Sequence, residues 1–127
     1  MTKNIAEFKD RLQQALDHKG WKAVDLVEVT NVPKGAVSYY LAGKSKPKAD
    51  RLYIMAQALE VSEVWLLGYD VPMRRSDNQK KNDQLAKLVA RLKRDENFYN
   101  TVVALSNLTE SQYRSIEQLI TTFNENL

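Results

Sequence analysis

Apolar side chains recur every three or four residues along the first part of the chain, and this spacing predicts amphipathic helices instead of strands. The first helix is expected to end at Gly20, a good C-cap residue, after an apolar stripe of Ile5, Phe8, Leu12, Ala15 and Leu16. A second helix is expected over residues 22–30, with Leu26 and Val27 buried. Asn31 then suits the left-handed backbone of a sharp turn.

A third helix is expected after the turn. Pro33 suits its first turn, where the missing N–H costs nothing, and Gly43 marks its end. Its inward residues are expected to be Val37, Tyr40 and Leu41.

Two further helices complete this part of the chain. The fourth helix is predicted from an apolar stripe of Leu52, Met55, Ala56 and Leu59. Ser62 and Glu63 favour the start of a short fifth helix that ends at Gly68. Residues 1–73 are therefore expected to form one five-helix domain, and the whole chain to be all-α.

The remainder of the chain differs in pattern. Residues 74–82 contain no apolar side chain, so a flexible basic linker is expected there. Residues 83–127 are expected to form two or three helices, because they carry three apolar stripes: Leu85, Leu88, Val89 and Leu92; Phe98, Val102 and Leu105; and Tyr113, Ile116, Leu119, Ile120, Phe123 and Leu127. This region holds too little apolar surface to form a stable folded unit by itself. An intrachain core, a homodimer interface and a surface for another protein all fit the stripes.

Composition limits the number of domains and the kinds of site that the chain can form. At 127 residues with 43% hydrophobic content, the chain can bury one hydrophobic core, or one core and a second, smaller one. It has no cysteine, which excludes disulfides and thiolate metal sites. The N-terminus has no long apolar run and resembles neither a signal peptide nor a membrane span, so a cytoplasmic protein without membrane contact is expected.

Charge is concentrated in one segment. Residues 1–81 carry 14 basic and 10 acidic side chains, whereas residues 82–127 carry 5 and 6. Residues 30–49 hold four lysines and no acid, at Lys34, Lys44, Lys46 and Lys48. A phosphate backbone is the natural partner of such a patch. Residues 23–42 also have the spacing of a helix-turn-helix, in which the second helix enters a DNA major groove.

One run covers the third helix, the loop that carries Lys44, Lys46 and Lys48 (the lysine loop), and the fourth and fifth helices: VPKGAVSYYLAGKSKPKADRLYIMAQALEVSEVWLLG. It resembles the lambda-repressor-like (Cro/Xre-type) helix-turn-helix DNA-binding domain of phage and mobile-element repressors, over about residues 8–73. The resemblance implies that base edges are read by Lys34, Gly35, Ser38 and Tyr39. It implies phosphate contacts from Lys44, Lys46 and Lys48, which follow the recognition helix.

Three positions depart from the family pattern. Val27 stands where the family usually has alanine, and Asn31 where it has glycine. Ala23 replaces a glutamine that contacts the DNA backbone, which leaves Lys22 as a candidate substitute for that phosphate contact.

The resembling domains act as dimers on paired half-sites, so self-association is the leading interpretation of the C-terminal stripes. The residues expected at that interface are Tyr113, Ile116, Leu119, Ile120 and Phe123. Nothing after Met73 resembles the peptidase domain of larger phage repressors, so an antirepressor or another inducing protein is an expected partner.

No enzymatic role is expected. Ser38 has no histidine for a triad, His18 has no second ligand for a metal, and no glycine-rich phosphate loop is present. Trp21 and Trp65 are expected to pack in the core, and no cofactor is predicted. The sequence therefore predicts a sequence-specific transcriptional repressor that binds an operator in double-stranded DNA as a dimer or higher oligomer. The alternative is a protein-binding adaptor or antitoxin-like module in which DNA binding is secondary.

Overall fold

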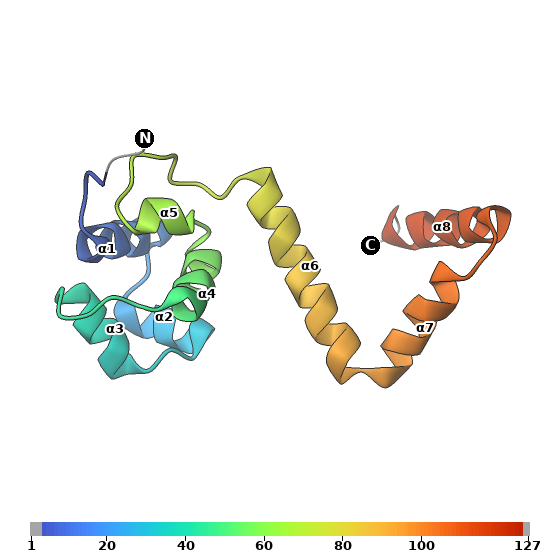
Figure 1. The fold of residues 1–127 in the computed structure, drawn as a ribbon, viewed down its shortest axis with the longest axis horizontal. Coiled ribbons are helices and arrows are strands. Elements are labelled where there is room, and N and C mark those ends of the chain that lie inside the picture. The colour runs from blue at the N-terminus through green and yellow to red at the C-terminus, as the bar shows by residue number, and fades with distance from the viewer. Residues whose placement is uncertain (1–3, 126–127) are drawn as a thin grey trace. The chain divides into compact units, whose positions relative to one another are not determined.

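The computed structural model describes residues 4–125 of the chain (Figure 1). Over that range it contains eight helices and no strand, which confirms the all-α prediction. The chain divides into two compact units, one ending at Asp83 and the other beginning at Gln84.

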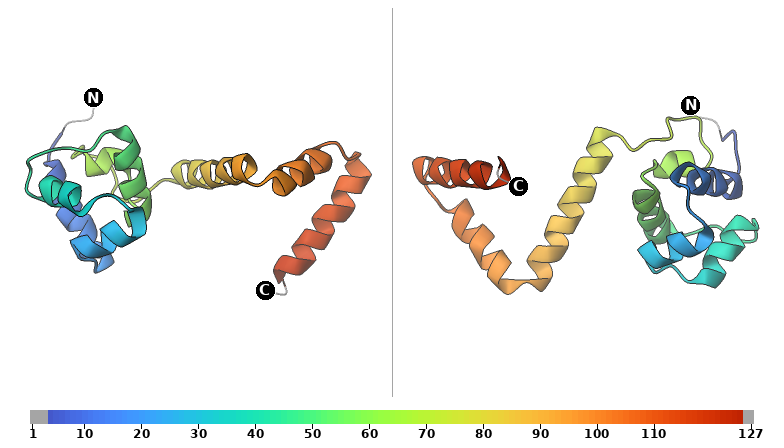
Figure 2. Two further views of the ribbon diagram at one scale, coloured as in Figure 1. Left: turned by 90° about the horizontal axis from the view of Figure 1, so that it is seen from below. Right: turned by 180° about the vertical axis from the view of Figure 1, so that it is seen from behind.

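The first unit is built from five helices before a sixth begins. They are α1 (Phe8–Lys19), α2 (Ala23–Thr30), α3 (Lys34–Leu41), α4 (Ala49–Leu59) and α5 (Glu63–Leu66). Helix α1 packs against α3, α4 and α5, and α2 packs against α3 and α4 (Figure 2). The order and approximate bounds match the five helices predicted from the apolar spacing.

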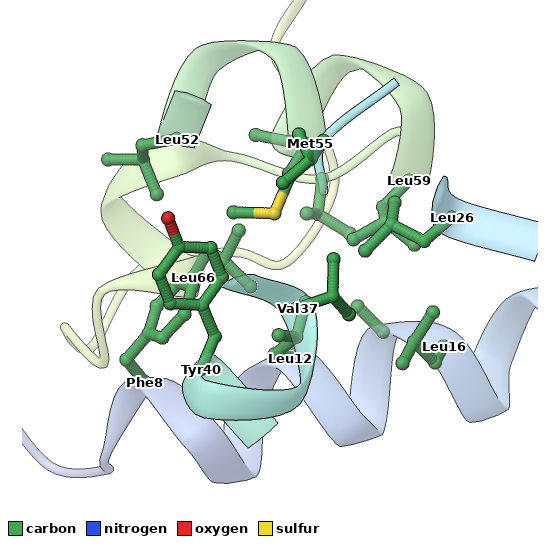
Figure 3. Packing of buried hydrophobic residues seen from close by; sticks show 14 of the residues in the cluster. Phe8, Leu12, Leu16, Leu26, Val37, Tyr40, Leu52, Met55, Leu59 and Leu66 are labelled. Atoms are coloured by element: carbon green, nitrogen blue, oxygen red, sulfur yellow. The ribbon is translucent and has the colours of Figure 1, made fainter. Parts of the chain in front are cut away.

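The core of this unit lies where α1, α2, α3 and α4 meet (Figure 3). Leu12, Leu26, Val37 and Met55 are fully buried there, and each comes from a different helix. The predicted inward face of α3 is confirmed at Val37 and Tyr40, while Leu41 is only partly buried. Ile5 is an exception to the first stripe: it lies before α1 and is 60% exposed, because the helix begins three residues later, at Phe8.

The predicted helix boundaries follow local backbone chemistry. Gly20 at the end of α1 and Asn31 at the end of α2 both adopt the left-handed conformation, with φ of 70° and 61°. Ser62 caps α5, since its hydroxyl accepts a hydrogen bond from the Trp65 N–H at 3.3 Å. Helix α3 begins at Lys34, so Pro33 is the cap residue instead of the first helical one.

The first unit continues beyond Met73 because Arg75 is buried against it, with 4% of its surface exposed. Its guanidinium donates to both carboxylate oxygens of Asp83, at 2.7 and 2.8 Å, and to the Val61 carbonyl at 3.0 Å. It also forms an ion pair with Glu63 of α5. Burial alone lowers the pKa of Arg75, but these carboxylates outweigh burial and raise it.

Helix α6 (Asp77–Arg94) starts inside the segment that was expected to be a flexible linker. The Ser76 hydroxyl accepts from the Gln79 N–H at 3.1 Å, and the Gln79 side chain accepts from the Ser76 N–H at 2.7 Å, which together cap the helix. The linker prediction for residues 74–82 is therefore corrected at Arg75 and at the helical residues 77–82. The absence of apolar side chains did not prevent packing, since Arg75 is buried as part of an ion cluster.

The second unit contains the remainder of α6 from Gln84, then α7 (Glu96–Ser106) and α8 (Glu110–Glu125). Asp95 caps α7 by accepting from the Phe98 N–H at 3.0 Å. Thr109 and Gln112 form a capping box at the start of α8, in which the backbone N–H of each residue donates to the side chain of the other, at 3.0 and 3.3 Å.

This second unit has no buried core over residues 84–125: every side chain there is exposed or only partly covered. Ten large apolar side chains of the unit are exposed, including all five residues named above for oligomerisation. Leu127, the last member of the predicted third stripe, lies outside the described residues.

Candidate nucleic-acid interface

Helices α2 and α3 form a helix-turn-helix, and the angle between them is fixed by buried side chains and by hydrogen bonds at the turn. On the inside, Leu26 of α2, Val32 of the turn and Val37 of α3 are buried together. At the turn, the Thr30 hydroxyl donates to the Leu26 carbonyl at 2.6 Å and accepts from the Val32 N–H at 3.2 Å. The turn is therefore tied to the end of α2, and α3 is presented at a fixed orientation.

The outward face of α3 carries the four residues predicted to read bases. Lys34, Gly35, Ser38 and Tyr39 are all exposed, and their spacing places them on one face of the helix. A Cβ added at Gly35 meets no atom within 4 Å, so the surface is open at this point. The four residues lie opposite the face that enters the core, as a groove-reading helix requires.

Tyr39 and Lys44 join the two halves of the predicted interface. The Lys44 ammonium lies 5.5 Å from the centre of the Tyr39 ring, a cation–π distance. This contact holds the first lysine of the loop beside the outward face of α3. Lys46 and Lys48 are exposed further along the loop, and Lys22 is exposed just before α2.

Arg51 was not predicted as a contact residue, yet it lies beside the lysine loop. Together with Lys46 and Lys48 it lines an open hollow of about 420 Å³ that is also bordered by Tyr40, Ser45 and Asp50. The Arg51 guanidinium donates to the Tyr40 hydroxyl at 3.2 Å, which orients it toward this hollow. Its position three residues after Lys48, one helical turn into α4, is the sequence signal that identifies it.

Lys9 is a second cation that sequence reasoning missed, because it comes from α1, far from the lysine loop in sequence. It lies against Gly43, where an added Cβ would come within 2.9 Å of Lys9 Cδ. Gly43 has φ of 76°, a left-handed conformation that favours glycine. Lys9 also lies 3.6 Å from Glu7, which offsets part of its charge.

The two tryptophans and His18 were not predicted to contact DNA. Trp65 is buried with the Arg11 guanidinium 4.5 Å from its ring, and Trp21 packs against the core, as predicted. His18 lies in the last turn of α1. Within residues 4–125, no group of three or more histidine and acidic side chains has the arrangement of a metal site. No helix in the described part of the chain is long and apolar enough to cross a membrane.

Comparison with known proteins places this geometry in a family context. The helix-turn-helix family matches residues 12–66, which include α2, the turn and α3. Among solved structures, the chain is similar to a transcriptional regulator from Listeria innocua, with 23% identity, 93% of this chain and 92% of that chain covered, and a TM-score of 0.46. It is also similar to a complex of SinR protein with SinI protein, with 19% identity, 94% and 99% covered, and a TM-score of 0.46. No curated protein matches the sequence.

Proposed function

Residues 12–66 form an Xre/Cro-type helix-turn-helix domain, the kind with which transcriptional regulators bind DNA, and from this premise we propose that the chain is a cytoplasmic, sequence-specific repressor. It binds an operator in double-stranded DNA as a dimer and excludes polymerase from the promoter. The observation that carries the proposal is the exposed polar face of α3, flanked by the lysine loop and held rigidly from behind by the core.

Base edges are read from the outward face of α3. Lys34 donates to guanine O6 or N7, and Ser38 donates to or accepts from either base of a pair. Tyr39 offers its ring to a thymine methyl group and its hydroxyl to a phosphate. Gly35 lets the helix backbone approach the groove closely, because no side chain stands between them.

Phosphates are held by the surrounding cations, which fix the register of α3 without reading sequence. Lys44, Lys46 and Lys48 contact the backbone after α3, and Lys22 contacts it before α2. Each neutralised phosphate adds about 0.9 to the slope of log affinity against log salt concentration.

Dimerisation brings two copies of α3 onto one face of the duplex, about 34 Å apart. The second unit supplies the interface, with Tyr113, Ile116, Leu119, Ile120 and Phe123 of α8 at its centre. Its exposed apolar side chains and lack of a core support this assignment, since burial against a second copy removes them from water.

The proposal is tested by a band-shift assay on the DNA upstream of the gene, which is expected to contain an inverted repeat. We expect a band that survives competition by scrambled DNA and is lost in the Lys34→Ala, Ser38→Ala double variant. Lys80→Ala is the matched control, because Lys80 is exposed on the part of α6 that belongs to the first unit, outside both the outward face of α3 and the second unit. Absence of a specific band at low salt contradicts the proposal.

The exposed apolar faces of the second unit also favour a second candidate function, an adaptor or antitoxin-like module that holds a protein partner. An inducing protein or antirepressor that binds these faces would reconcile the two roles. Indifference to heparin, together with capture of one protein through residues 83–127, would favour the adaptor as the main function.

A further inference from the structure

Two helices of the second unit expose apolar faces that nothing in the unit covers. Helix α8 does so at the five residues proposed for oligomerisation, and the part of α6 in the second unit does so at Leu85, Leu88 and Val89. Over residues 84–125 the three helices do not pack along one another. The two faces are therefore unpartnered within one copy.

The charges on these two helices are opposite in sign. Residues 84–94 of α6 contain four basic side chains and no acidic one. Helix α8 contains Glu110, Glu117 and Glu125 against a single arginine, Arg114.

Part of this charge is already paired inside the unit. Arg114 lies 3.0 Å from Glu110, and Arg91 lies 3.7 Å from Asp95 and over the Phe98 ring. Among the described residues, Glu117 on α8 and Lys87, Lys93 and Arg94 on α6 have no ion-pair partner. An excess of positive charge remains on α6, and an excess of negative charge remains on α8.

The charged residues border the apolar faces. Lys93 follows Val89 by four residues, and Glu117 follows Tyr113 by four, so each lies beside an exposed apolar side chain on its own helix. Packing α8 against a second α8 would bring like charges together, and so would packing α6 against a second α6. Of these three pairings, α6 against α8 is the one that matches both the apolar faces and the charges.

We propose that α6 of one copy packs against α8 of a second copy, and that the same contact is repeated in the other direction. This inference rests on the dimer of the proposed function and specifies how it is built. A two-fold axis requires such reciprocity, because each surface patch that one copy offers must be met by its counterpart on the other. The second copy is the occupant favoured by the unit's charge balance, since it carries equal numbers of basic and acidic residues over 84–127.

Cysteine cross-linking tests the pairing, because the chain has no cysteine of its own. We expect Leu88→Cys chains and Ile116→Cys chains to form a disulfide-linked dimer only when the two are mixed. Ala90→Cys mixed with Ile116→Cys is the matched control and should remain uncross-linked, because Ala90 lies on the opposite side of α6. Cross-linking of Ile116→Cys chains alone would overturn the pairing in favour of α8 against α8.

Two other results also overturn it: no cross-link in the mixture, or a cross-link confined to one chain in the Leu88→Cys, Ile116→Cys double variant. Sedimentation and operator binding of the unmodified chain report on the proposed function separately. A dimer that binds the operator but lacks this cross-link refutes only the pairing, whereas a monomer at all concentrations refutes the proposed dimer itself.

Charge reversal gives an independent readout on the same pairing. Lys93→Glu or Glu117→Lys alone is expected to weaken dimerisation about two- to thirtyfold, because one exposed ion pair contributes up to about fivefold and the reciprocal contact contains the pair twice. The double reversal is expected to recover it. Failure of the double variant to recover affinity when each single variant loses it contradicts contact between these two edges.

Discussion

The rings of Phe8 and Tyr40 meet edge to face, with centroids 6.1 Å apart and planes at 86°. This contact joins α1 to the inner face of α3, directly behind the outward residues proposed to read DNA. Tyr40 has a second task, because its hydroxyl accepts the hydrogen bond from Arg51 at the edge of the basic hollow. One side chain thus fixes the recognition helix and orients a neighbouring cation.

Two substitutions separate the contribution of the Tyr40 ring from that of its hydroxyl. Tyr40→Ala is expected to destabilise the first unit by about 3–5 kcal/mol, as for other large aromatic truncations in a core. Tyr40→Phe keeps the ring and is expected to cost about 1 kcal/mol or less. Urea unfolding followed by circular dichroism measures both. Equal losses of stability would show that the hydroxyl, and not the ring contact with Phe8, holds α3.

Gly35→Ala distinguishes binding from folding. No atom of the protein lies within 4 Å of an added Cβ, and the helix gains about 0.5–1 kcal/mol when alanine replaces glycine. We therefore predict a higher melting temperature together with weaker operator binding, since the methyl group intrudes on the groove. A variant that melts higher and binds DNA as tightly as the original would place the DNA away from Gly35.

The lysine loop is expected to act through phosphates. Lys46→Ala and Lys48→Ala should each weaken binding to operator DNA and binding to non-specific DNA by the same factor. Each should also reduce the slope of log affinity against log salt concentration by about 0.9. Arg51→Ala should behave in the same way if the hollow holds a phosphate. The measurement is fluorescence anisotropy across a salt series, and Lys80→Ala should leave the slope unchanged.

The boundary of the first unit is expected to lie after Asp83. Residues 1–83 should unfold at a clearly higher urea concentration than residues 1–73, because the shorter fragment lacks Arg75 and leaves Glu63 without its partner. In the full chain, Arg75→Ala should cost about 3–5 kcal/mol, since it leaves Asp83 with an uncompensated charge in a largely buried site. Equal stability of the two fragments would mean that this ion cluster contributes nothing net.

The contrast between Arg75 and α3 shows what the sequence could predict and why. The α3 core residues, the Asn31 turn and the α5 cap follow from local spacing and backbone preference, which a single sequence contains. The burial of Arg75 depends on Asp83, Glu63 and the Val61 carbonyl converging in space, and the composition of residues 74–82 indicated the opposite. Lys9 was missed for the same reason, because its proximity to Gly43 and the lysine loop is a property of the fold, whereas the spacing of Arg51 after Lys48 could have identified that residue.

The central claim is that the outward face of α3 reads base edges while the loop lysines hold phosphates. Selection of preferred sequences from a randomised DNA pool, compared between the unmodified chain and its Lys34→Ala and Lys46→Ala variants, tests it most directly. We predict that Lys34→Ala relaxes the preference at one base position in each half-site, whereas Lys46→Ala lowers affinity and leaves the preferred sequence unchanged. An unchanged preferred sequence in the Lys34→Ala, Ser38→Ala double variant would contradict the claim.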